Sequence, residues 1–131
     1  MRLLPILLIF ALSPPAIAQD AEQTKAFNEA WFAYSEARDA GSAKRMMETA
    51  STVYEIAREL FPADDERLPL LMEHYGQALL LNGESERARD MFKEALEHTR
   101  EIHGEQSTEV LPILMNYADS EASFQRSGRQ R

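Results

Sequence analysis

Apolar side chains recur every three or four residues along most of this chain, and no segment alternates apolar and polar residues as a strand would. The clearest example covers residues 43–61, and a second example covers residues 84–103. The apolar positions of the first are Ala43, Met46, Met47, Ala50, Val53, Tyr54, Ala57, Leu60 and Phe61. Charged residues occupy the opposite face, so one face is expected to be buried and the other solvated. The pattern predicts amphipathic helices.

Three further segments with the helical period are residues 21–38, 68–82 and 111–124. Gly41 and Gly83 follow the first two of these segments, where helices commonly end in a left-handed residue that glycine adopts without steric cost. Pro69 and Pro112 must lie close to a helix start, because only in the first turn does the missing N–H cost no hydrogen bond. The chain is therefore predicted to be all-α, with five helices.

The first eighteen residues have the composition of a secretory signal peptide. Met1-Arg2 gives a positive start, residues 3–12 are apolar, and Ala16-Ile17-Ala18 has the small residues of a cleavage site. The alternative is an uncleaved membrane anchor, but ten apolar residues fall short of the roughly 20 that span a bilayer. We expect residues 1–18 to be removed and the protein to be periplasmic or secreted, in a bacterial envelope, with no membrane insertion after cleavage.

The remaining chain is expected to divide into a helical domain, residues 19–125, and a short basic tail, residues 126–131. The tail carries three arginines and is predicted to be a frayed, soluble end. The formal charge is -8, and it becomes -9 over 113 residues once Arg2 is removed with the signal peptide. Nucleic acids and anionic lipids select for clustered Lys and Arg, so this charge argues against both as partners. Cysteine is absent, so the fold has no disulfides or thiolate metal sites.

One passage of the sequence occurs twice, about 42 residues apart. Arg-Glu-Leu at residues 58–60 and Leu-Pro-Leu-Leu-Met at 68–72 return as Arg-Glu-Ile at 100–102 and Leu-Pro-Ile-Leu-Met at 111–115. A period of 20 to 50 residues is typical of stacked repeats, in which a single unit cannot bury its own apolar face. The duplication favours a binding scaffold over an enzyme.

A set of large and small residues follows the spacing 0, 3, 4, 7, 11, 16, 20 and 23: Met72, Tyr75, Gly76, Leu79, Gly83, Ala88, Phe92 and Ala95. This spacing resembles the tetratricopeptide repeat, and the period near 42 is similar to the longer-helix variety seen in kinesin light chain. In such a hairpin, Gly76 and Ala88 allow the two helix backbones to approach, and Phe92 fills the space between them. The resemblance implies a right-handed solenoid of helical hairpins, with about two and a half units.

The other two units match the repeat less fully. In the first unit, residues 27–61, the corresponding residues are Ala30, Ala33, Tyr34, Ala37, Gly41, Met46, Ala50 and Val53. Tyr34 stands at the small position and Ala50 at the aromatic one, so the large and small partners are exchanged. The third unit supplies a first helix only, with Leu114, Tyr117 and Ala118 in register. Polar positions there suit the end of a solenoid, and the alternative is that this helix is a simple cap.

The resemblance also implies a binding groove on the first helix of each unit. The residues carried over, called the groove residues below, are Asn28, Trp31, Ser35, Arg38, Leu70, Glu73, Gln77, Leu80, Met115 and Asp119. They imply a non-catalytic module that binds a peptide or a partner helix. Trp31, the single tryptophan, is a candidate anchor for that partner. The alternative is that Trp31 closes the N-terminal end of the core.

No arrangement of residues in the sequence indicates catalysis, so we predict no enzyme activity, no cofactor and no metal site. His98 and His103 are five residues apart, whereas two helical zinc ligands need a spacing of four. The acidic residues 64–66 precede a helix, where they favour the positive end of its dipole.

Two other functions stay open. The chain can be a structural or homo-oligomerising envelope unit, which an apolar patch on the outer face of the last helix would favour. It can also be a small-ligand or metal carrier, an idea that rests only on Glu94 and His98. We expect a monomer or a weak homo-oligomer.

Overall fold

The computed structural model describes residues 16–130, and these residues form five helices with no strand among them. The helices are α1 (Ala16–Asp39), α2 (Ala43–Leu60), α3 (Arg67–Leu81), α4 (Ser85–His103) and α5 (Val110–Arg129). The prediction of an all-α chain is confirmed. Residues 1–15 of the predicted signal peptide lie outside the described residues, and residues 16–18 begin α1. No helix in the described range is long and apolar enough to cross a bilayer.

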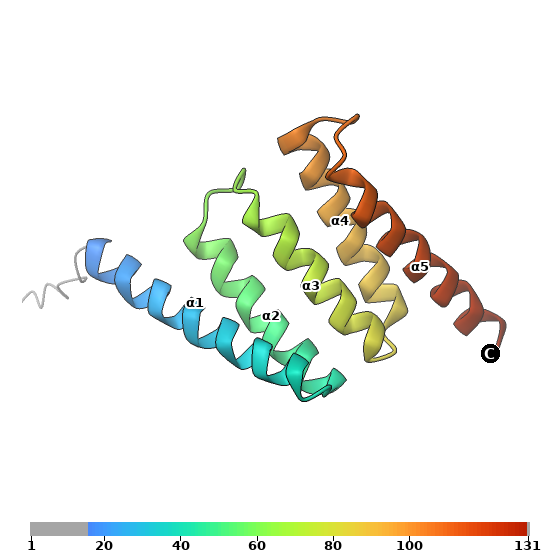
Figure 1. Cartoon of the computed structure of the whole chain (residues 1–131), viewed down its shortest axis with the longest axis horizontal. Helices are drawn as coiled ribbons and strands as arrows, with labels where there is room; N and C mark the ends of the chain where they lie inside the picture. Colours follow the sequence, from blue (N-terminus) through green and yellow to red (C-terminus); the bar gives the residue numbers. More distant parts are fainter. Residues whose placement is uncertain (1–15, 131) are drawn as a thin grey trace, which may run out of the picture.

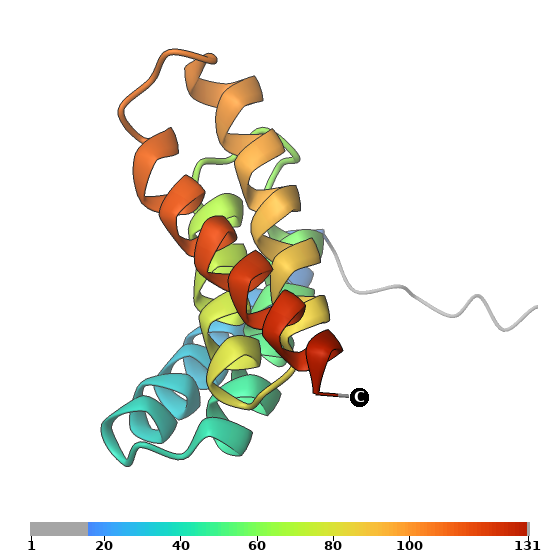
Figure 2. The same cartoon turned by 90° about the vertical axis from the view of Figure 1, so that its right-hand side faces the viewer.

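The five helices follow one another in order across the molecule, each antiparallel to the next (Figure 1). Each helix packs against its neighbour in the sequence, and α3 also contacts α5. Seen from the side, α1, α3 and the first part of α5 lie on one side and α2 and α4 on the other, and the end of α5 crosses toward the side of α4 (Figure 2). The helices α1 and α3 and the first part of α5 therefore share one face of the molecule.

The two short turns are built identically around a glycine. Gly41 has a φ of 67° and Gly83 a φ of 81°. After α1, the N–H of Ser42 donates to the carbonyl of Ala37 at 3.1 Å, and the N–H of Glu84 donates to Leu79 at 2.9 Å after α3. This pair of turns is the glycine C-cap predicted from the sequence, because only glycine takes positive φ without strain.

The two longer loops lead into helices whose third residue is proline, Pro69 in α3 and Pro112 in α5. Both prolines therefore lie in the first turn, as predicted. Asp65 fixes the start of α3, because its carboxylate accepts hydrogen bonds from the N–H and the guanidinium of Arg67 at 2.9 and 2.8 Å. These bonds lower the pKa of Asp65 to about 2. The carboxylate at position 65 thus caps a helix, as expected for the acidic residues 64–66.

The core runs through all five helices and contains most of the repeat positions of the first two units, whereas in the third unit Leu114 and Tyr117 are half-buried and Ala118 is exposed. Its buried apolar residues are Tyr34, Ala37, Met46, Ala50, Val53, Tyr54, Ala57, Leu68, Leu71, Met72, Tyr75, Ala78, Leu79, Ala88, Phe92, Ala95, Leu96, Val110 and Ile113. The helices α3 and α4 approach closely at Gly76, against which the fully buried ring of Phe92 lies. In the first hairpin the large residue is on the other helix, since Tyr34 is buried beside Ala50. The exchange predicted from the sequence thus places an aromatic ring within both hairpins.

The C-terminal helix is longer than predicted. We expected α5 to end at Phe124, but it continues to Arg129 and includes most of the predicted basic tail. Side-chain bonds to Ser123 support the extra turn, from the Ser127 hydroxyl to its carbonyl at 3.0 Å and from Arg126 to its hydroxyl at 3.2 Å. Arginines in the last turn also favour the negative end of the helix dipole.

Replacing Gly76 with alanine is expected to destabilise the fold. A Cβ at this position would lie 2.7 Å from Cε1 of Phe92, and that ring is fully buried and has no space to withdraw. Overpacking of this kind costs about 1–3 kcal/mol. The gain in helix propensity on replacing glycine is at most about 1 kcal/mol, so the overlap is expected to win. Urea denaturation should show a lower midpoint for Gly76→Ala.

The matched control is Gly128→Ala. Gly128 is also helical, but it is exposed and a Cβ there would meet nothing within 4 Å. Its urea midpoint is expected to stay level or rise. Equal shifts of the midpoint in the two variants would contradict the close contact between α3 and Phe92.

Candidate functional site

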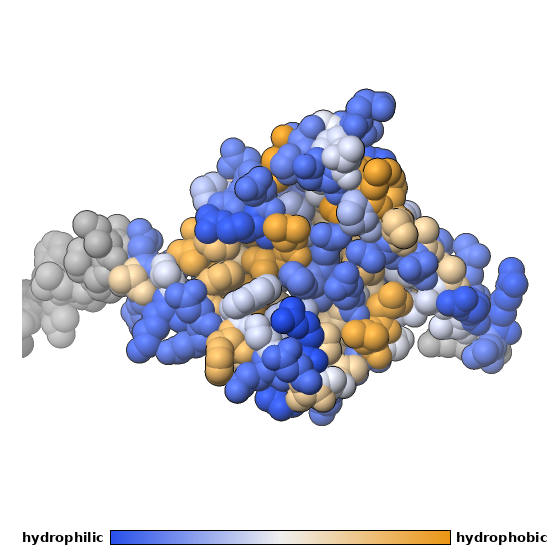
Figure 3. Space-filling model, in the orientation of Figure 1, coloured by the Kyte–Doolittle hydropathy of each residue, from blue (hydrophilic) through white to orange (hydrophobic). Residues whose placement is uncertain are grey.

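All ten groove residues lie on α1, α3 and the first part of α5, which share one face, and none of them is buried. Trp31, Ser35, Glu73 and Leu80 are half-buried, and the others are exposed. The orientation of Figure 1 looks onto this face, and the space-filling view shows apolar surface there interrupted by polar residues (Figure 3). The residues that the resemblance selected are therefore all at least partly accessible, on three helices that lie side by side in the order α1, α3, α5.

An aromatic cluster joins α1 to α3 on this face. The ring of Trp31 lies 5.4 Å from that of Tyr34 and 5.5 Å from that of His74. The Tyr34 hydroxyl lies 3.2 Å from Nδ1 of His74, within hydrogen-bonding distance. Burial lowers the pKa of His74 below its ordinary value of 6.5, and the charge of Arg38 lowers it further. The indole is thus partly fixed against the core and partly accessible.

Between α3 and α5, the position equivalent to the aromatic cluster is occupied by a polar junction, the pair Glu73 and Asn116. Nδ2 of Asn116 donates to Oε1 of Glu73 at 3.3 Å. Glu73 is 42 residues after Trp31 and Asn116 is 42 residues after His74, so the two junctions are equivalent in the repeat. Burial raises the pKa of the Glu73 carboxyl, and the bond from Asn116 partly offsets this. Sequence reasoning missed Asn116, although its offset from His74 was visible.

Two clefts lie at equivalent places beside these junctions. The first cleft has a volume of about 400 Å³ and is lined by Asp20, Thr24, Phe27, Asn28, Leu60, Phe61, Pro62 and Arg67. The second cleft has a volume of about 350 Å³ and is lined by Glu66, Pro69, Leu70, Glu73, Thr99, His103, Glu109, Pro112 and Ile113. Five pairs of lining residues are 42 apart: 24 and 66, 27 and 69, 28 and 70, 61 and 103, 67 and 109. The clefts are thus a repeated feature of the fold.

The first cleft is aromatic, and its charged lining residues are Asp20 and Arg67. The rings of Phe27 and Phe61 meet edge to face with centroids 5.3 Å apart. The guanidinium of Arg67 lies 3.7 Å from the centroid of the Phe61 ring and pairs with Asp65 at 2.6 Å. The chain's own arginine therefore stacks on the aromatic wall of this cleft.

The second cleft is acidic. Glu66, Glu73 and Glu109 line it, and within residues 16–130 none of the three forms an ion pair. His103 is the one basic side chain in the lining. Thr99 also contributes, is only 3% exposed, and its hydroxyl has no hydrogen-bond partner. The cleft thus holds three carboxylates without an ion pair and one hydroxyl without a hydrogen-bond partner. Glu73 accepts a bond from Asn116, and Glu109 accepts bonds from the hydroxyls of Ser107 and Thr108.

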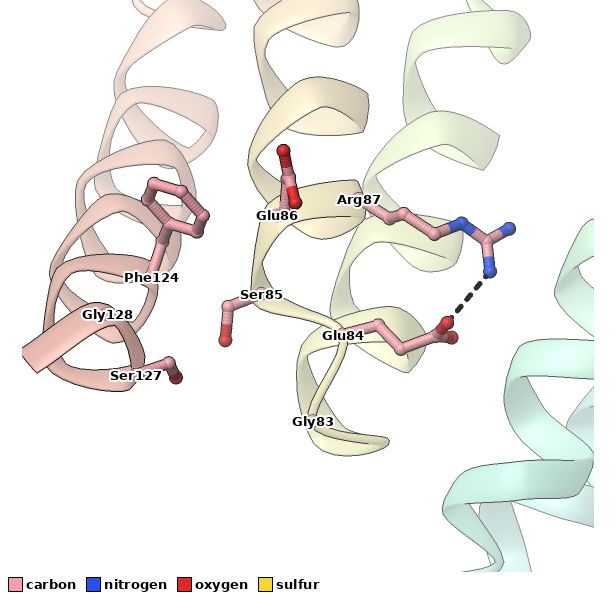
Figure 4. A pocket seen from close by; sticks show the side chains of 8 residues that line it. All are labelled: Gly83, Glu84, Ser85, Glu86, Arg87, Phe124, Ser127 and Gly128. Carbon is pink, nitrogen blue, oxygen red and sulfur yellow. Dashed lines mark hydrogen bonds and ion pairs between the residues drawn. The ribbon is translucent and has the colours of Figure 1, made fainter. Parts of the chain in front are cut away.

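A third hollow, of about 510 Å³, lies at the other end of α4 (Figure 4). It is lined by Gly83, Glu84, Ser85, Glu86, Arg87, Phe124, Ser127 and Gly128. Its arginine is already engaged, because Arg87 bonds to Glu84 at 3.0 Å and to the Tyr75 hydroxyl at 2.7 Å. No serine here has a basic partner that could activate it, so the hollow has no arrangement typical of catalysis.

The metal-carrier hypothesis rests on Glu94 and His98, which both lie on α4. Glu94 lies close to Tyr54, whose hydroxyl donates to Oε1 of Glu94 at 3.4 Å. The structure brings no three His, Asp or Glu side chains into a group suited to a metal ion within the described part of the chain.

No protein-family model matches the sequence, and neither a curated protein nor a solved structure matches it. The resemblance to tetratricopeptide repeats therefore rests on the spacing of residues described in the sequence analysis.

The environment of His74 predicts a pH dependence of stability. Because the pKa of His74 is lower in the folded state, the unfolded chain takes up the proton more readily as the pH falls. The stability that comes from burying the neutral His74 ring is therefore present above about pH 6.5 and is lost at lower pH. The free energy of unfolding of the wild type should fall relative to that of His74→Gln between about pH 7.5 and pH 5. Urea denaturation at several pH values measures this difference.

Comparing the two proteins at each pH cancels the other titrating groups. Glu73 is one such group. Its raised pKa has the opposite effect, because its contribution to the free energy of unfolding is lost as the pH rises. A difference between wild type and His74→Gln that is constant across the pH range would contradict the assignment.

Proposed function

We propose that this chain is an exported, non-catalytic protein-interaction module of the tetratricopeptide type. It would be a right-handed solenoid of about two and a half hairpins that binds a peptide or a partner helix on α1, α3 and α5. The observation that carries the proposal is the repetition on this face: two junctions and two clefts recur at an offset of 42 residues. A repeated surface suits a ligand that is itself extended, since successive residues of the ligand can meet successive clefts.

The composition of the face supports a peptide or helix as the ligand. Trp31 offers a half-buried aromatic ring on α1, and Arg38, Gln77 and Asp119 offer exposed polar groups on α1, α3 and α5. Anchoring by one large ring surrounded by polar residues is typical of protein interfaces. With only three helices on the face, the buried area would be small and the affinity modest.

Export is part of the proposal and rests on residues 1–18. Cleavage after Ala18 would leave a chain that begins at Gln19 and carries a charge of -9. The partner would then be a protein or peptide of the periplasm or the medium, and nucleic acid is not expected among its ligands.

A photo-crosslinking residue in place of Gln77 tests the proposal. Gln77 is exposed near the middle of α3, between the other groove residues. In the exporting cell, position 77 is expected to capture a partner, because that side chain points to solvent on the proposed binding face. Trp31→Ala should reduce the yield, which is measured by mass spectrometry of the crosslinked products.

The control places the same residue at Lys93, which is exposed on α4 in the other layer. Little or no capture of the same partner is expected there. Equal capture at the two positions, with no effect of Trp31→Ala, would contradict the assignment of the binding face.

A second candidate function is self-association through α5, which an exposed apolar stripe favours. Leu111 is 58% exposed and Met115, one of the groove residues, is 70% exposed. Ala118, one turn further, is exposed as well. In the preceding unit the residue equivalent to Ala118 is Gly76, which lies under Phe92 of α4. No helix of residues 16–130 covers α5 in that way, so a second copy could cover it.

Sedimentation velocity over a wide concentration range tests self-association. If the stripe forms an interface, the wild type should sediment faster as its concentration rises, because a larger species becomes populated. Met115→Gln, which removes apolar surface from an exposed position, should sediment as a monomer throughout. A wild type that is monomeric at every concentration would exclude this candidate.

A further inference from the structure

We infer that the second cleft binds an arginine side chain of an extended peptide that lies along α3 and α5. The inference rests on the proposed function, and it names the chemistry of the partner. Its basis is the juxtaposition, in one cleft, of three carboxylates, an unpartnered buried hydroxyl and apolar walls.

The walls of the second cleft suit the stem of an arginine. Leu70 and Pro112 are exposed at its edge, and Ile113 is buried beside them. Long basic side chains place their methylene groups along such apolar surfaces while the charged end reaches polar groups. The walls would therefore hold the aliphatic part of the side chain.

The carboxylates supply charge complementarity. Glu66, Glu73 and Glu109 form no ion pair with any described residue. Glu73 is half-buried, and Asn116 is its one hydrogen-bond donor from a side chain in this part of the structure. A partly desolvated carboxylate gains most from a cation that donates hydrogen bonds to it, because little water competes for its oxygens.

The hydroxyl at the cleft favours a guanidinium over an ammonium group. The Oγ1 atom of Thr99 is buried and has no partner, although such groups are nearly always hydrogen-bonded. A guanidinium has five N–H groups spread in a plane, so it can reach several acceptors at once, whereas an ammonium group is compact. Several acceptors at different places in one cleft therefore match arginine better than lysine.

The first cleft provides an internal comparison. The residues 42 positions before Glu66, Glu73 and Glu109 are Thr24, Trp31 and Arg67, and Thr24 and Arg67 line the first cleft. The one carboxylate in the lining of the first cleft is Asp20. Arg67 itself stacks on the wall of the first cleft. The same position in the repeat thus carries a guanidinium in one cleft and a carboxylate in the other. A cationic ligand would therefore meet more negative charge in the second cleft, with three carboxylates, than in the first, with Asp20 and a paired arginine.

The test begins with peptides selected from a random display library on the exported, purified protein. The selected peptides are expected to share an arginine. Fluorescence anisotropy should show that replacing this arginine with citrulline, which keeps the shape but removes the charge, weakens binding about tenfold or more. Replacing it with lysine should weaken binding by a smaller factor.

Variants of the protein locate the arginine. Glu73→Gln and Glu109→Gln should each weaken the binding of the arginine peptide. They should also reduce the difference in affinity between the arginine and citrulline peptides. Glu97→Gln, which changes an exposed carboxylate on α4, should leave the affinity unchanged. Glu109→Arg places a positive charge in the cleft and should weaken the arginine peptide's binding more than Glu109→Gln does. Circular dichroism verifies that each variant is folded.

Failure of this inference can be told apart from failure of the proposed function. Peptides that crosslink at position 77, but that carry no arginine or bind equally to Glu73→Gln and Glu109→Gln, would overturn the inference and leave the function in place. A library that yields no binding peptide would contradict both.

Discussion

The close approach of α3 and α4 determines the geometry of the stack. Phe92 lies where a side chain at position 76 would otherwise be, so the ring touches the backbone of α3 directly. In the first hairpin, Tyr34 of α1 fills the corresponding space against Ala50 of α2. One ring per hairpin therefore fixes the spacing of its helices, because protein interiors tolerate neither overlap nor voids. That spacing aligns α1, α3 and the first part of α5 on one face and produces the two equivalent clefts.

Local signals in the sequence predicted the helices well, because each helix depends on residues near to it in the chain. Gly41 and Gly83 ended helices, Pro69 and Pro112 marked helix starts, and the apolar period gave the buried faces. The end of α5 was wrong because side-chain bonds to Ser123 continue the helix past Phe124 without an apolar pattern. Local polar bonds of this kind leave no periodic signal.

The candidate site could be predicted only in part. The repeat spacing selected residues that the structure leaves at least partly exposed on α1, α3 and α5. The partners of individual side chains could not be predicted. Asn116 of α5 bonds to Glu73 of α3, and Thr99 of a third helix, α4, lines the second cleft. Which side chains meet depends on how the helices stack, and the sequence encodes that only through the sizes of the residues at their crossings.

The exchange of large and small residues between the two hairpins restricts how such a chain can change in length. Repeat proteins commonly gain or lose units by recombination between similar segments. A hybrid hairpin that joined α1 to α4 would bring Tyr34 and Phe92 into the same space, and one that joined α3 to α2 would place Gly76 opposite Ala50 and leave a void. Crossovers within a hairpin would therefore yield poorly packed products, and only whole hairpins could be exchanged. The two units are similar in sequence yet not interchangeable as parts.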